Sequence, residues 1–228
     1  ELGYSSQCEQ RIITFERKLQ LIKRFITKGS IIDVGCASGE FLYVARSHGW
    51  KIFGIEINEK LADIGKKKMG IEIFNGTLED ANIPETSYDV ATLFDVIEHL
   101  PQPLVALRKI HSILKDNGLL VINFPDVGSL TARLFKRRWW FFLEDHISYF
   151  NKKTLRMLLE KANFKILSVK NHYQSLEIGY LIKLFSAYYP KIAGIVGFIA
   201  NLLFLNKVPI TYSAGQTTVV AQKISKDR

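Results

Sequence analysis

The strongest chemical signal in the sequence is a run of small residues that follows a short β-branched segment. Asp33 precedes the run, and Gly35, Cys36, Ala37 and Gly39 lie within it. Small residues at a turn from a strand into a helix let a ligand approach the backbone closely, so that the amides at the helix start face it. This spacing predicts a nucleotide-binding turn.

Two acids near this turn narrow the chemistry of the ligand. Asp33 lies before the first glycine, where a carboxylate would repel a pyrophosphate and attract a cationic amino acid group. Glu56 ends the next expected strand, and a carboxylate at that edge can accept hydrogen bonds from both hydroxyls of a ribose. A dinucleotide site would show G-x-G-x-x-G without the preceding acid. The acids therefore predict a ligand that has a ribose and a cationic amino acid end but no phosphate.

The expected elements explain how these acids meet. Short β-branched segments alternate with segments whose apolar residues recur at helical spacing. Strands are expected at 30–34, 51–56, 71–74, 88–94, 119–124, 164–172 and 217–224, and helices at 8–27, 41–45, 58–68, 102–114 and 151–162. This alternation predicts an α/β fold with a doubly wound, mostly parallel sheet that is covered on both faces.

With these motifs the chain resembles the class I S-adenosylmethionine-dependent methyltransferases, whose first motif reads acid-x-Gly-x-Gly-x-Gly. The order of motifs through residue 170 is similar to the branch that holds small-molecule O-methyltransferases of the ubiquinone-biosynthesis type and many cell-envelope methyltransferases. The resemblance implies a Rossmann-like sheet with an N-terminal helix and a C-terminal helical lid. It also implies S-adenosylmethionine as cofactor and S-adenosylhomocysteine as product.

The resemblance assigns roles to the residues that match the family's motifs. Gly35 and Gly39 would line the methionine part of the cofactor, and Asp33 would hold its amino group. Glu56 would bind the ribose, and Ile57 would lie against the adenine. The implied cofactor-binding residues are Asp33, Gly35, Cys36, Ala37, Gly39, Phe41, Glu56, Ile57, Thr77, Leu78, Asp95 and Val96.

The chain departs from the family's pattern at two of these positions. Ala37 replaces the middle glycine, so that a methyl group would narrow the turn. Thr77 replaces the acid that reads the adenine edge in the family, while Leu78 would still supply a backbone amide and an apolar face.

Candidates for the chemistry follow the fourth and fifth expected strands. Asp95-x-x-Glu98-His99 is similar to a metal-binding pattern of the ubiquinone-biosynthesis O-methyltransferases, and such groups suit a divalent cation. We place a structural role for Glu98 and His99 first and expect no metal.

His146 lies in a segment that the resembled group uses to close the substrate side, and imidazole could take a proton from an alcohol. His146 is the first choice for a catalytic base and His99 the second, with a structural role for each as the alternative.

The positive charge is concentrated in the last third of the chain. The sequence holds 31 Lys+Arg and 22 Asp+Glu, a net charge of +9. Residues 151–228 contain 12 of these basic and 3 of these acidic side chains, so they supply the whole excess. Such a field attracts phosphorylated metabolites, anionic lipid headgroups or nucleic acid, and a solvated lysine-rich surface is the alternative.

An apolar segment interrupts this basic region. From 192 to 205 the sequence has no charged residue, whereas a spanning helix needs about twenty apolar residues. We expect a helical insertion at about 176–207 that lies as a lid against the sheet. The second interpretation is peripheral contact with an anionic membrane, in which Lys183, Lys191 and Lys207 would meet headgroups.

We therefore expect one domain, 1–228, with an N-terminal helix at 1–28, a cofactor-binding half at 29–126 and a substrate side at 127–228. Cys8 and Cys36 form no Cys-x-x-Cys pair, which favours a reducing, cytoplasmic compartment.

The expected function is methyl transfer from S-adenosylmethionine to a hydroxyl of a small or lipid-linked, anionic acceptor. RNA methylation is an alternative that the net charge favours, although the basic region lacks a module with stacking aromatics, so a nucleic-acid partner is not expected. A second alternative, suggested by Ala37 and Thr77, is a non-catalytic protein that binds the cofactor. A dehydrogenase is the weakest alternative. The oligomeric state is not predicted.

Overall fold

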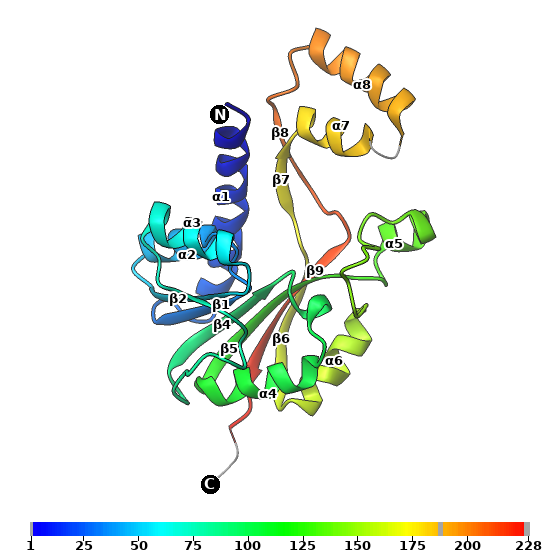
Figure 1. The fold of residues 1–228 in the computed structure, drawn as a ribbon. Coiled ribbons are helices and arrows are strands. Elements are labelled where there is room, and N and C mark those ends of the chain that lie inside the picture. The colour runs from blue at the N-terminus through cyan, green and yellow to red at the C-terminus, as the bar shows by residue number, and fades with distance from the viewer. Residues whose placement is uncertain (1, 187–188, 226–228) are drawn as a thin grey trace.

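The computed structural model describes residues 2–186 and 189–225, without the side chains of 2–10 and 184. Its main sheet contains β1 (Ser30–Val34), β2 (Lys51–Glu56), β3 (Ile73–Asn75), β4 (Tyr88–Phe94), β5 (Leu114–Pro125), β6 (Phe164–Asn171) and β9 (Gln216–Lys223). The strand order is β3-β2-β1-β4-β5-β9-β6 (Figure 1). Strands β1 to β5 pair in parallel, and β9 is antiparallel to β5 and β6. The expectation of a doubly wound, mostly parallel sheet is confirmed.

Helices cover both faces of this sheet. They are α1 (Leu2–Lys23), α2 (Glu40–Ser47), α3 (Glu59–Met69), α4 (Pro103–Ile113) and α6 (Lys152–Lys161). Helix α5 (Leu130–Phe135) lies beside the carboxyl end of the sheet instead (Figure 1), and the short 3-10 turns are η1 (Ile97–His99) and η2 (Lys136–Arg138). On one face, Leu19 and Ile22 of α1 join α2 and α3 in a core over β1. On the other face, α4 and α6 bury Leu107, Leu155 and their neighbours. Two apolar cores therefore hold the strand ends rigidly in place.

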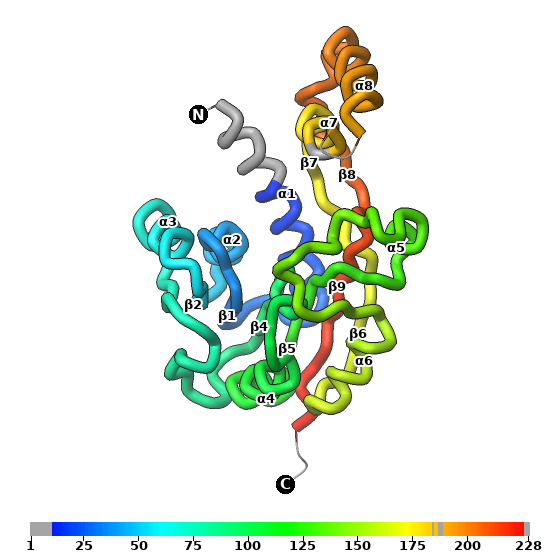
Figure 2. Tube along the Cα trace, turned by 45° about the vertical axis from the view of Figure 1, so that its right-hand side comes forward, coloured from blue at the N-terminus to red at the C-terminus, as the bar shows by residue number. Residues whose placement is uncertain are grey.

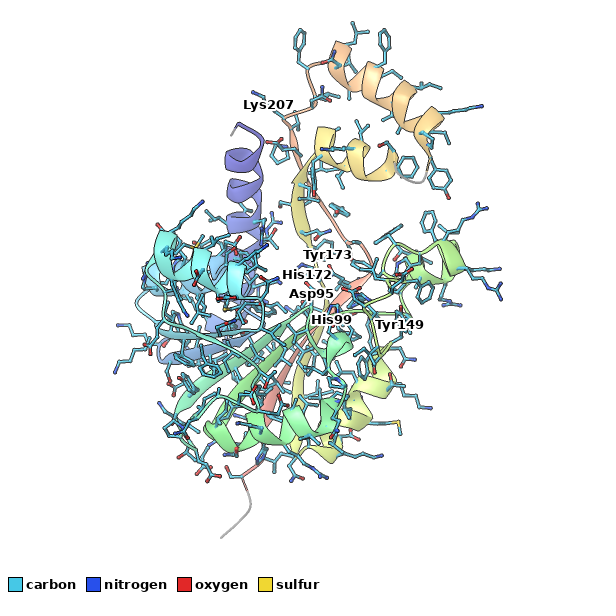
Figure 3. The ribbon with its side chains drawn as sticks, viewed as in Figure 1. Asp95, His99, Tyr149, His172, Tyr173 and Lys207 are labelled. Atoms are coloured by element: carbon cyan, nitrogen blue, oxygen red, sulfur yellow. The ribbon has the colours of Figure 1, made fainter. Side chains whose placement is uncertain are left out.

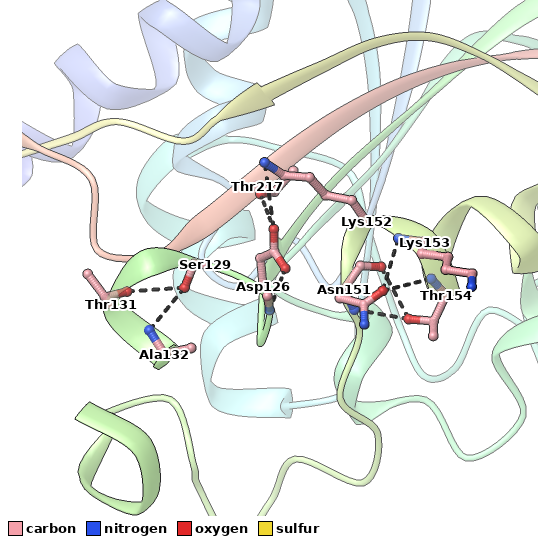
Figure 4. Close-up of polar contacts among 10 residues, drawn as sticks. Asp126, Ser129, Thr131, Ala132, Asn151, Lys152, Lys153, Thr154 and Thr217 are labelled. Atoms are coloured by element: carbon pink, nitrogen blue, oxygen red, sulfur yellow. Dashed lines mark hydrogen bonds and ion pairs between the residues drawn. The ribbon is translucent and has the colours of Figure 1, made fainter. Parts of the chain in front are cut away.

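Helix α6 begins where the sequence predicts it. The Asn151 side chain accepts hydrogen bonds from the amides of Lys153 and Thr154, both at 2.9 Å (Figure 4). The Thr154 hydroxyl accepts from the Asn151 amide at 3.0 Å, which completes a reciprocal capping box.

A buried acid, Asp126, ties the end of β5 to its neighbours. Its carboxylate accepts hydrogen bonds from the Thr217 hydroxyl of β9 at 2.9 Å and from the Gly128 amide at 2.8 Å (Figure 4). The Lys152 ammonium lies 3.9 Å away. The segment 127–150, which crosses the carboxyl end of the sheet, is thus anchored where it leaves β5.

The C-terminal insertion is built differently from the expected lid. A two-stranded antiparallel ribbon, β7 (Gln174–Glu177) and β8 (Pro209–Tyr212), carries α7 (Ile178–Ser186) and α8 (Pro190–Leu202). Figure 1 shows both helices above the main sheet, where they pack on each other at the tip of the ribbon. The expectation of a lid packed against the sheet is therefore wrong, because the ribbon, which the sequence analysis did not predict, lifts the helices away. Among the described residues, no helix combines the length and the apolar character needed to cross a membrane.

Candidate active site

The predicted residues meet at the carboxyl ends of β1, β2 and β4. Strand order reverses between β1 and β4, and in open α/β sheets this is the point where a crevice forms. Figure 3 shows Asp95 and His99 at this edge, with His172 and Tyr149 approaching it from later parts of the chain. The site therefore combines strand ends with segments that are distant in sequence.

The small-residue turn after β1 is held by hydrogen bonds within the cofactor-binding half. The amides of Gly35 and Cys36 donate to the Ile55 carbonyl oxygen at 2.8 and 3.0 Å. The Ala37 amide donates to Glu56 Oε2, and the Asn58 amide to Glu56 Oε1, both at 2.8 Å. Glu56 thus fixes the turn against β2, and the remaining lone pairs of its oxygens can still accept hydrogen bonds.

Backbone conformation explains why this turn needs small residues. Gly35 has φ +73°, and a Cβ atom there would overlap the Val96 side chain. Gly39 has φ +80° and faces Ile71, so that its role lies in packing α2 rather than in lining a cavity. Ala37 adopts φ 49°, a left-handed conformation that costs an L-residue roughly 1–2 kcal/mol. The methyl group at Ala37 therefore strains the turn where the family's pattern has glycine.

Asp33 lies beneath the turn with a well-defined partner. It is buried, and its Oδ1 accepts a hydrogen bond from the Thr92 hydroxyl at 2.6 Å. Burial raises the pKa of Asp33 to about 7, although the Thr92 hydrogen bond and the charge of Lys18 lower it. A cation that binds beside Asp33 would favour its ionised form.

Two cavities meet at Gly35 and divide the predicted residues between them. One, of about 240 Å³, is lined by Asp33, Cys36, Ala37, Phe41 and Asp95. The other, of about 480 Å³, is lined by Ile57, Thr77, Leu78 and Val96. As the described residues form them, Gly39 and Glu56 line neither cavity. The first suits the methionine end of the expected cofactor, and the second, with its mostly apolar walls, suits the adenine.

Thr77, which lines the second cavity, forms a polar pair with Asp80, which lies outside the lining. The Thr77 hydroxyl donates to Asp80 Oδ2 at 2.6 Å, which lowers the pKa of Asp80. Glu79, an acid that the sequence analysis did not assign, lines the cavity. An acid therefore lines the cavity that suits the adenine, although Thr77 occupies the position where the family's pattern has one.

Cys36 and Phe41 contribute packing. Cys36 is buried below the turn, and burial raises the pKa of its thiol, so that it is no nucleophile. The Phe41 ring meets the Phe94 ring edge to face at 4.9 Å between centroids. These side chains form the apolar floor of the first cavity.

Asp95 leaves β4 in a left-handed conformation, with φ 59°. Its Oδ1 accepts hydrogen bonds from the side-chain amides of Asn123, at 2.7 Å, and Gln216. Desolvation by the surrounding protein raises the pKa of Asp95, while the charge of Lys18 and the hydrogen bonds from the two amides lower it. Neighbouring strands therefore aim this carboxylate into the first cavity.

The two predicted histidines come together although they lie far apart in sequence. The rings of His99 and His146 meet edge to face, with centroids 4.7 Å apart. The amides of Ile147 and Ser148 donate to the Glu98 carbonyl oxygen at 2.9 and 3.0 Å, which docks the His146 segment onto η1. His99 also lines the second cavity, so the pair borders the expected cofactor site.

Buried polar atoms without partners distinguish this histidine pair. Both carboxyl oxygens of Glu98 and Nδ1 of His146 make no hydrogen bond within the described structure. Burial, and then the charge of Asp95, raise the pKa of Glu98 to about 8. Burial and His99 lower the pKa of His146. The cluster therefore has the unmet hydrogen-bonding capacity of a site that a ligand or water completes.

The metal pattern considered in the sequence differs from the group that the structure assembles. Glu98, His99 and His146 bring one potential ligand atom each within 4.8 Å of one another. Asp95 is not part of this group of described residues, because Asn123 and Gln216 hold its carboxylate. His146 takes the place that the pattern gave to Asp95.

Several residues of the first cavity were missed in the sequence. Arg11, Thr14, Phe15 and Lys18 of α1 line it, as do residues of the segment 172–176. Lys18 is buried, with its ammonium 3.9 Å from the centroid of the Phe94 ring. A lysine three positions after Phe15, on the apolar face of an expected helix, was the signal that could have identified it.

Curated relatives and a family model describe proteins similar to this chain. The model of the family described as "Methyltransferase domain" matches residues 8–169. Demethylmenaquinone methyltransferase of Staphylococcus aureus is 22% identical over 205 residues, which cover 74% of this chain and 85% of the relative.

Solved structures share the fold along almost the whole chain. A possible histamine N-methyltransferase of Thermotoga maritima superimposes with a TM-score of 0.64 at 19% identity, covering 97% of this chain and 95% of its own. A SAM-dependent methyltransferase of Archaeoglobus fulgidus gives a TM-score of 0.65 at 20% identity and 94% coverage of each chain. The acceptors named for these relatives, histamine and demethylmenaquinone, differ, so they show the fold and do not identify an acceptor.

Proposed function

Because the chain belongs to the methyltransferase domain family and is an S-adenosylmethionine-dependent methyltransferase, we propose that it methylates a hydroxyl oxygen of a small or lipid-linked, anionic acceptor. The observation that supports this proposal best is the pair of histidines beside the unpartnered Glu98, at the border of the cofactor cavities. A hydroxyl needs to lose a proton as its oxygen is methylated, and this cluster offers a place for that proton.

The residues around the two cavities fit the cofactor. Gly35 leaves free a space that a Cβ atom would fill, and Asp33 and Asp95 supply negative charge in the first cavity. We propose that Asp33 binds the amino group, and Ile57 with Leu78 the adenine. Glu56 lines neither cavity, but each of its oxygens accepts one amide and keeps a lone pair, and we propose that these bind the ribose. S-adenosylmethionine supplies an electrophilic methyl group on a positively charged sulfur.

The proposed base, His146, has the right form at neutral pH. Its lowered pKa keeps the imidazole neutral, and Nδ1 has no partner within the described structure. A neutral imidazole nitrogen can accept a proton from a hydroxyl. Glu98, close by, is mostly protonated at this pH because its pKa is raised to about 8, and a positive charge that forms on the ring would favour its ionised form.

His99 is oriented by a backbone contact. Its Nδ1 lies 2.9 Å from the Asp145 carbonyl oxygen, which can only accept a hydrogen bond. Nδ1 therefore carries the proton, and Nε2 offers a lone pair. This tautomer suits His99 to position an acceptor hydroxyl or to act as the second base.

Support for an anionic acceptor comes from α1. Arg11 and Lys18 line the first cavity together with Asp33 and Asp95. Arg11 also forms an ion pair with Glu40 at 3.0 Å. A negatively charged acceptor group that enters beside α1 would meet the half-exposed Arg11, whereas Lys18 is buried beside Asp33 and Asp95, and burial lowers its pKa.

The proposal is tested by turnover with radiolabelled S-adenosylmethionine over a panel of hydroxyl-bearing and amine-bearing acceptors. We expect methylation of hydroxyls, and a fall in kcat of about 100-fold in His146→Ala with little change in the KM of the cofactor. In His99→Ala, kcat should fall less than in His146→Ala. In His48→Ala, at the far end of α2, kcat should match that of the wild type. Full turnover in both site variants would remove the proposed roles, and methylation of amines alone would contradict an oxygen acceptor.

The same acceptor panel tests the alternative of a non-catalytic cofactor-binding protein. S-adenosylhomocysteine binding by calorimetry, combined with no turnover on any acceptor, would favour a non-catalytic role for the pocket.

A further inference from the structure

The α7–α8 hairpin, defined as residues 178–204, leaves an unusual amount of apolar surface uncovered. Phe198 is 72% exposed and Phe204 is 91% exposed. The other exposed apolar side chains of the hairpin are Phe185, Ile192, Ile195, Val196, Ile199, Leu202 and Leu203. Exposed apolar patches of this kind on a folded protein mark a site of interaction.

The exposed side chains of α8 form a wide arc. At 100° per residue, Phe198, Leu202, Ile195 and Ile199 are followed around the helix by Ile192, Leu203 and Val196. These positions span an arc of about 160°. Ala193 and Ala200 are buried, and Gly197 faces Ile182 of α7. The helix therefore packs on α7 through a narrow small-residue face and presents its bulky side chains outward.

The charges around this surface have one sign. From 178 to 215 the sequence contains Lys183, Lys191 and Lys207 and no acidic residue. All three lysines are exposed, and Figure 3 shows Lys207 beside the ribbon that carries the hairpin. Two copies of this surface would bring like charges together, which disfavours self-association.

A second segment on the same side repeats this combination. Leu130 and Leu134 of α5 are 80% and 72% exposed. The exposed basic residues of α5 and η2 are Arg133, Lys136, Arg137 and Arg138. Figures 1 and 2 both place α5 on the side of the molecule on which α7 and α8 project.

We propose that the α7–α8 hairpin inserts its apolar arc into the surface of a membrane that contains anionic lipid. Lys183, Lys191 and Lys207, together with the basic residues of α5 and η2, contact the headgroup phosphates. Apolar side chains enter the boundary between headgroups and acyl chains, while the basic side chains are attracted to the negative surface. The helices lie on the membrane, in accord with the absence of a spanning helix among the described residues.

This inference adds a partner to the proposed methyltransferase and does not depend on the reaction. Membrane binding is measured with the full chain alone, without cofactor or acceptor. A failure to bind vesicles would leave the proposed oxygen methylation standing, and a failure of turnover would leave membrane binding standing.

The experiment is co-sedimentation with phosphatidylcholine vesicles that contain or lack about 30 mol% phosphatidylglycerol. The wild type should bind the anionic vesicles and stay in the supernatant with phosphatidylcholine alone. Phe198→Asp combined with Leu202→Asp should weaken binding at least about tenfold, because two apolar side chains no longer enter the interface. The triple change of Lys183, Lys191 and Lys207 to Gln should weaken it by about 100-fold.

Met157→Asp on α6 is the matched control, since Met157 is also an exposed apolar side chain, 49% exposed, but lies away from the hairpin. It should bind like the wild type. S-adenosylhomocysteine binding should be unchanged in all variants, which shows that they are folded.

Equal recovery of the wild type in the supernatant with both vesicle types would overturn the proposal, as would wild-type binding by the aspartate variant.

Gel filtration completes the test. A dimer that the Phe198→Asp and Leu202→Asp changes dissociate, in a protein that ignores vesicles, would identify a second copy as the occupant.

Discussion

The turn after β1 and the Glu98 cluster lie at the same edge of one sheet but differ in how completely they are hydrogen-bonded. In the turn, the amides of Gly35 and Ala37 have backbone or Glu56 acceptors, and Asp33 has Thr92. In the cluster, the Glu98 carboxyl oxygens and His146 Nδ1 have no partner in the described structure. The turn proposed to bind the cofactor is thus organised in advance, whereas the cluster proposed to act on the acceptor has polar groups left without partners.

This difference has an energetic consequence. A turn that satisfies its own hydrogen bonds costs little reorganisation when a ligand binds. A buried carboxyl without a partner costs the protein stability until a proton, water or ligand compensates it. The unpartnered groups that destabilise the folded protein therefore lie where chemistry is proposed, as expected of a functional site.

The largest effect should follow from filling the turn. Gly35→Ala places a Cβ atom on Val96 and strains a residue with φ +73°. We expect S-adenosylhomocysteine affinity to fall by at least about 100-fold, measured by calorimetry. Gly49→Ala is the matched control, because Gly49 has φ +81° but open space around its Cβ position. If both variants bind equally well, the turn is more adaptable than its hydrogen bonds indicate.

The next effect is a pH dependence of stability at Glu98. Its pKa is raised from 4.5 to about 8, so between these values the folded protein binds more protons than the unfolded chain. The free energy of unfolding should fall as the pH rises through this window, and the loss should be complete above pH 8. Glu98→Gln keeps a neutral group and should be more stable than the wild type by roughly 5 kcal/mol above pH 8, the equivalent of a pKa shift of this size, and equally stable near pH 4.

Urea unfolding across this pH range measures the difference. Glu160→Gln, an exposed position on α6, should follow the wild-type curve. If the free energy of unfolding depends on pH in the same way in Glu98→Gln and in the wild type, the Glu98 carboxyl has a hydrogen-bonding partner in solution. The contrast between the turn after β1 and the Glu98 cluster would then disappear.

The same contrast explains which parts of the site could be predicted from the sequence. Asp33, Gly35 and Glu56 belong to consecutive strand ends, so a parallel sheet brings them together once its strands are recognised. The strands 30–34, 51–56 and 88–94 were predicted at their observed bounds, because β-branched and apolar residues dominate them. Local patterns and topology thus sufficed to predict that these strand-end residues lie together.

Contacts between distant segments could not be predicted in this way. Lys18 reaches the first cavity from α1, and His146 reaches His99 because the amides of Ile147 and Ser148 bind the Glu98 carbonyl oxygen. Helical spacing places Lys18 on the apolar face of α1, but no spacing states which cavity that face reaches or which loop docks onto η1. The ribbon β7–β8 was missed because its strands are short and are separated by the hairpin, whose apolar character suggested burial.

A smaller effect concerns cofactor binding and Asp33. Its pKa of about 7 leaves the carboxyl largely neutral in slightly acidic solution, where it cannot pair with an ammonium group. S-adenosylhomocysteine affinity should therefore rise about tenfold from pH 5.5 to 7, as Asp33 ionises. Asp33→Asn should bind more weakly at pH 7 and lose this dependence, while Asp63→Asn, on the surface of α3, should retain it. A pH-independent affinity in the wild type would mean that Asp33 does not contact the amino group.

The smallest effect separates strain from function within the turn. Ala37 has φ 49°, a conformation that favours glycine, so Ala37→Gly should raise the free energy of unfolding by about 0.5–1 kcal/mol in urea unfolding. Ala45→Gly, at an ordinary helical position in α2, should lower it by about 1 kcal/mol. Stabilisation with unchanged S-adenosylhomocysteine affinity would show that the strain at Ala37 is incidental to binding. Stabilisation with weakened affinity would mean that the Ala37 methyl contacts the ligand, and the turn, like the Glu98 cluster, would then exchange stability for function.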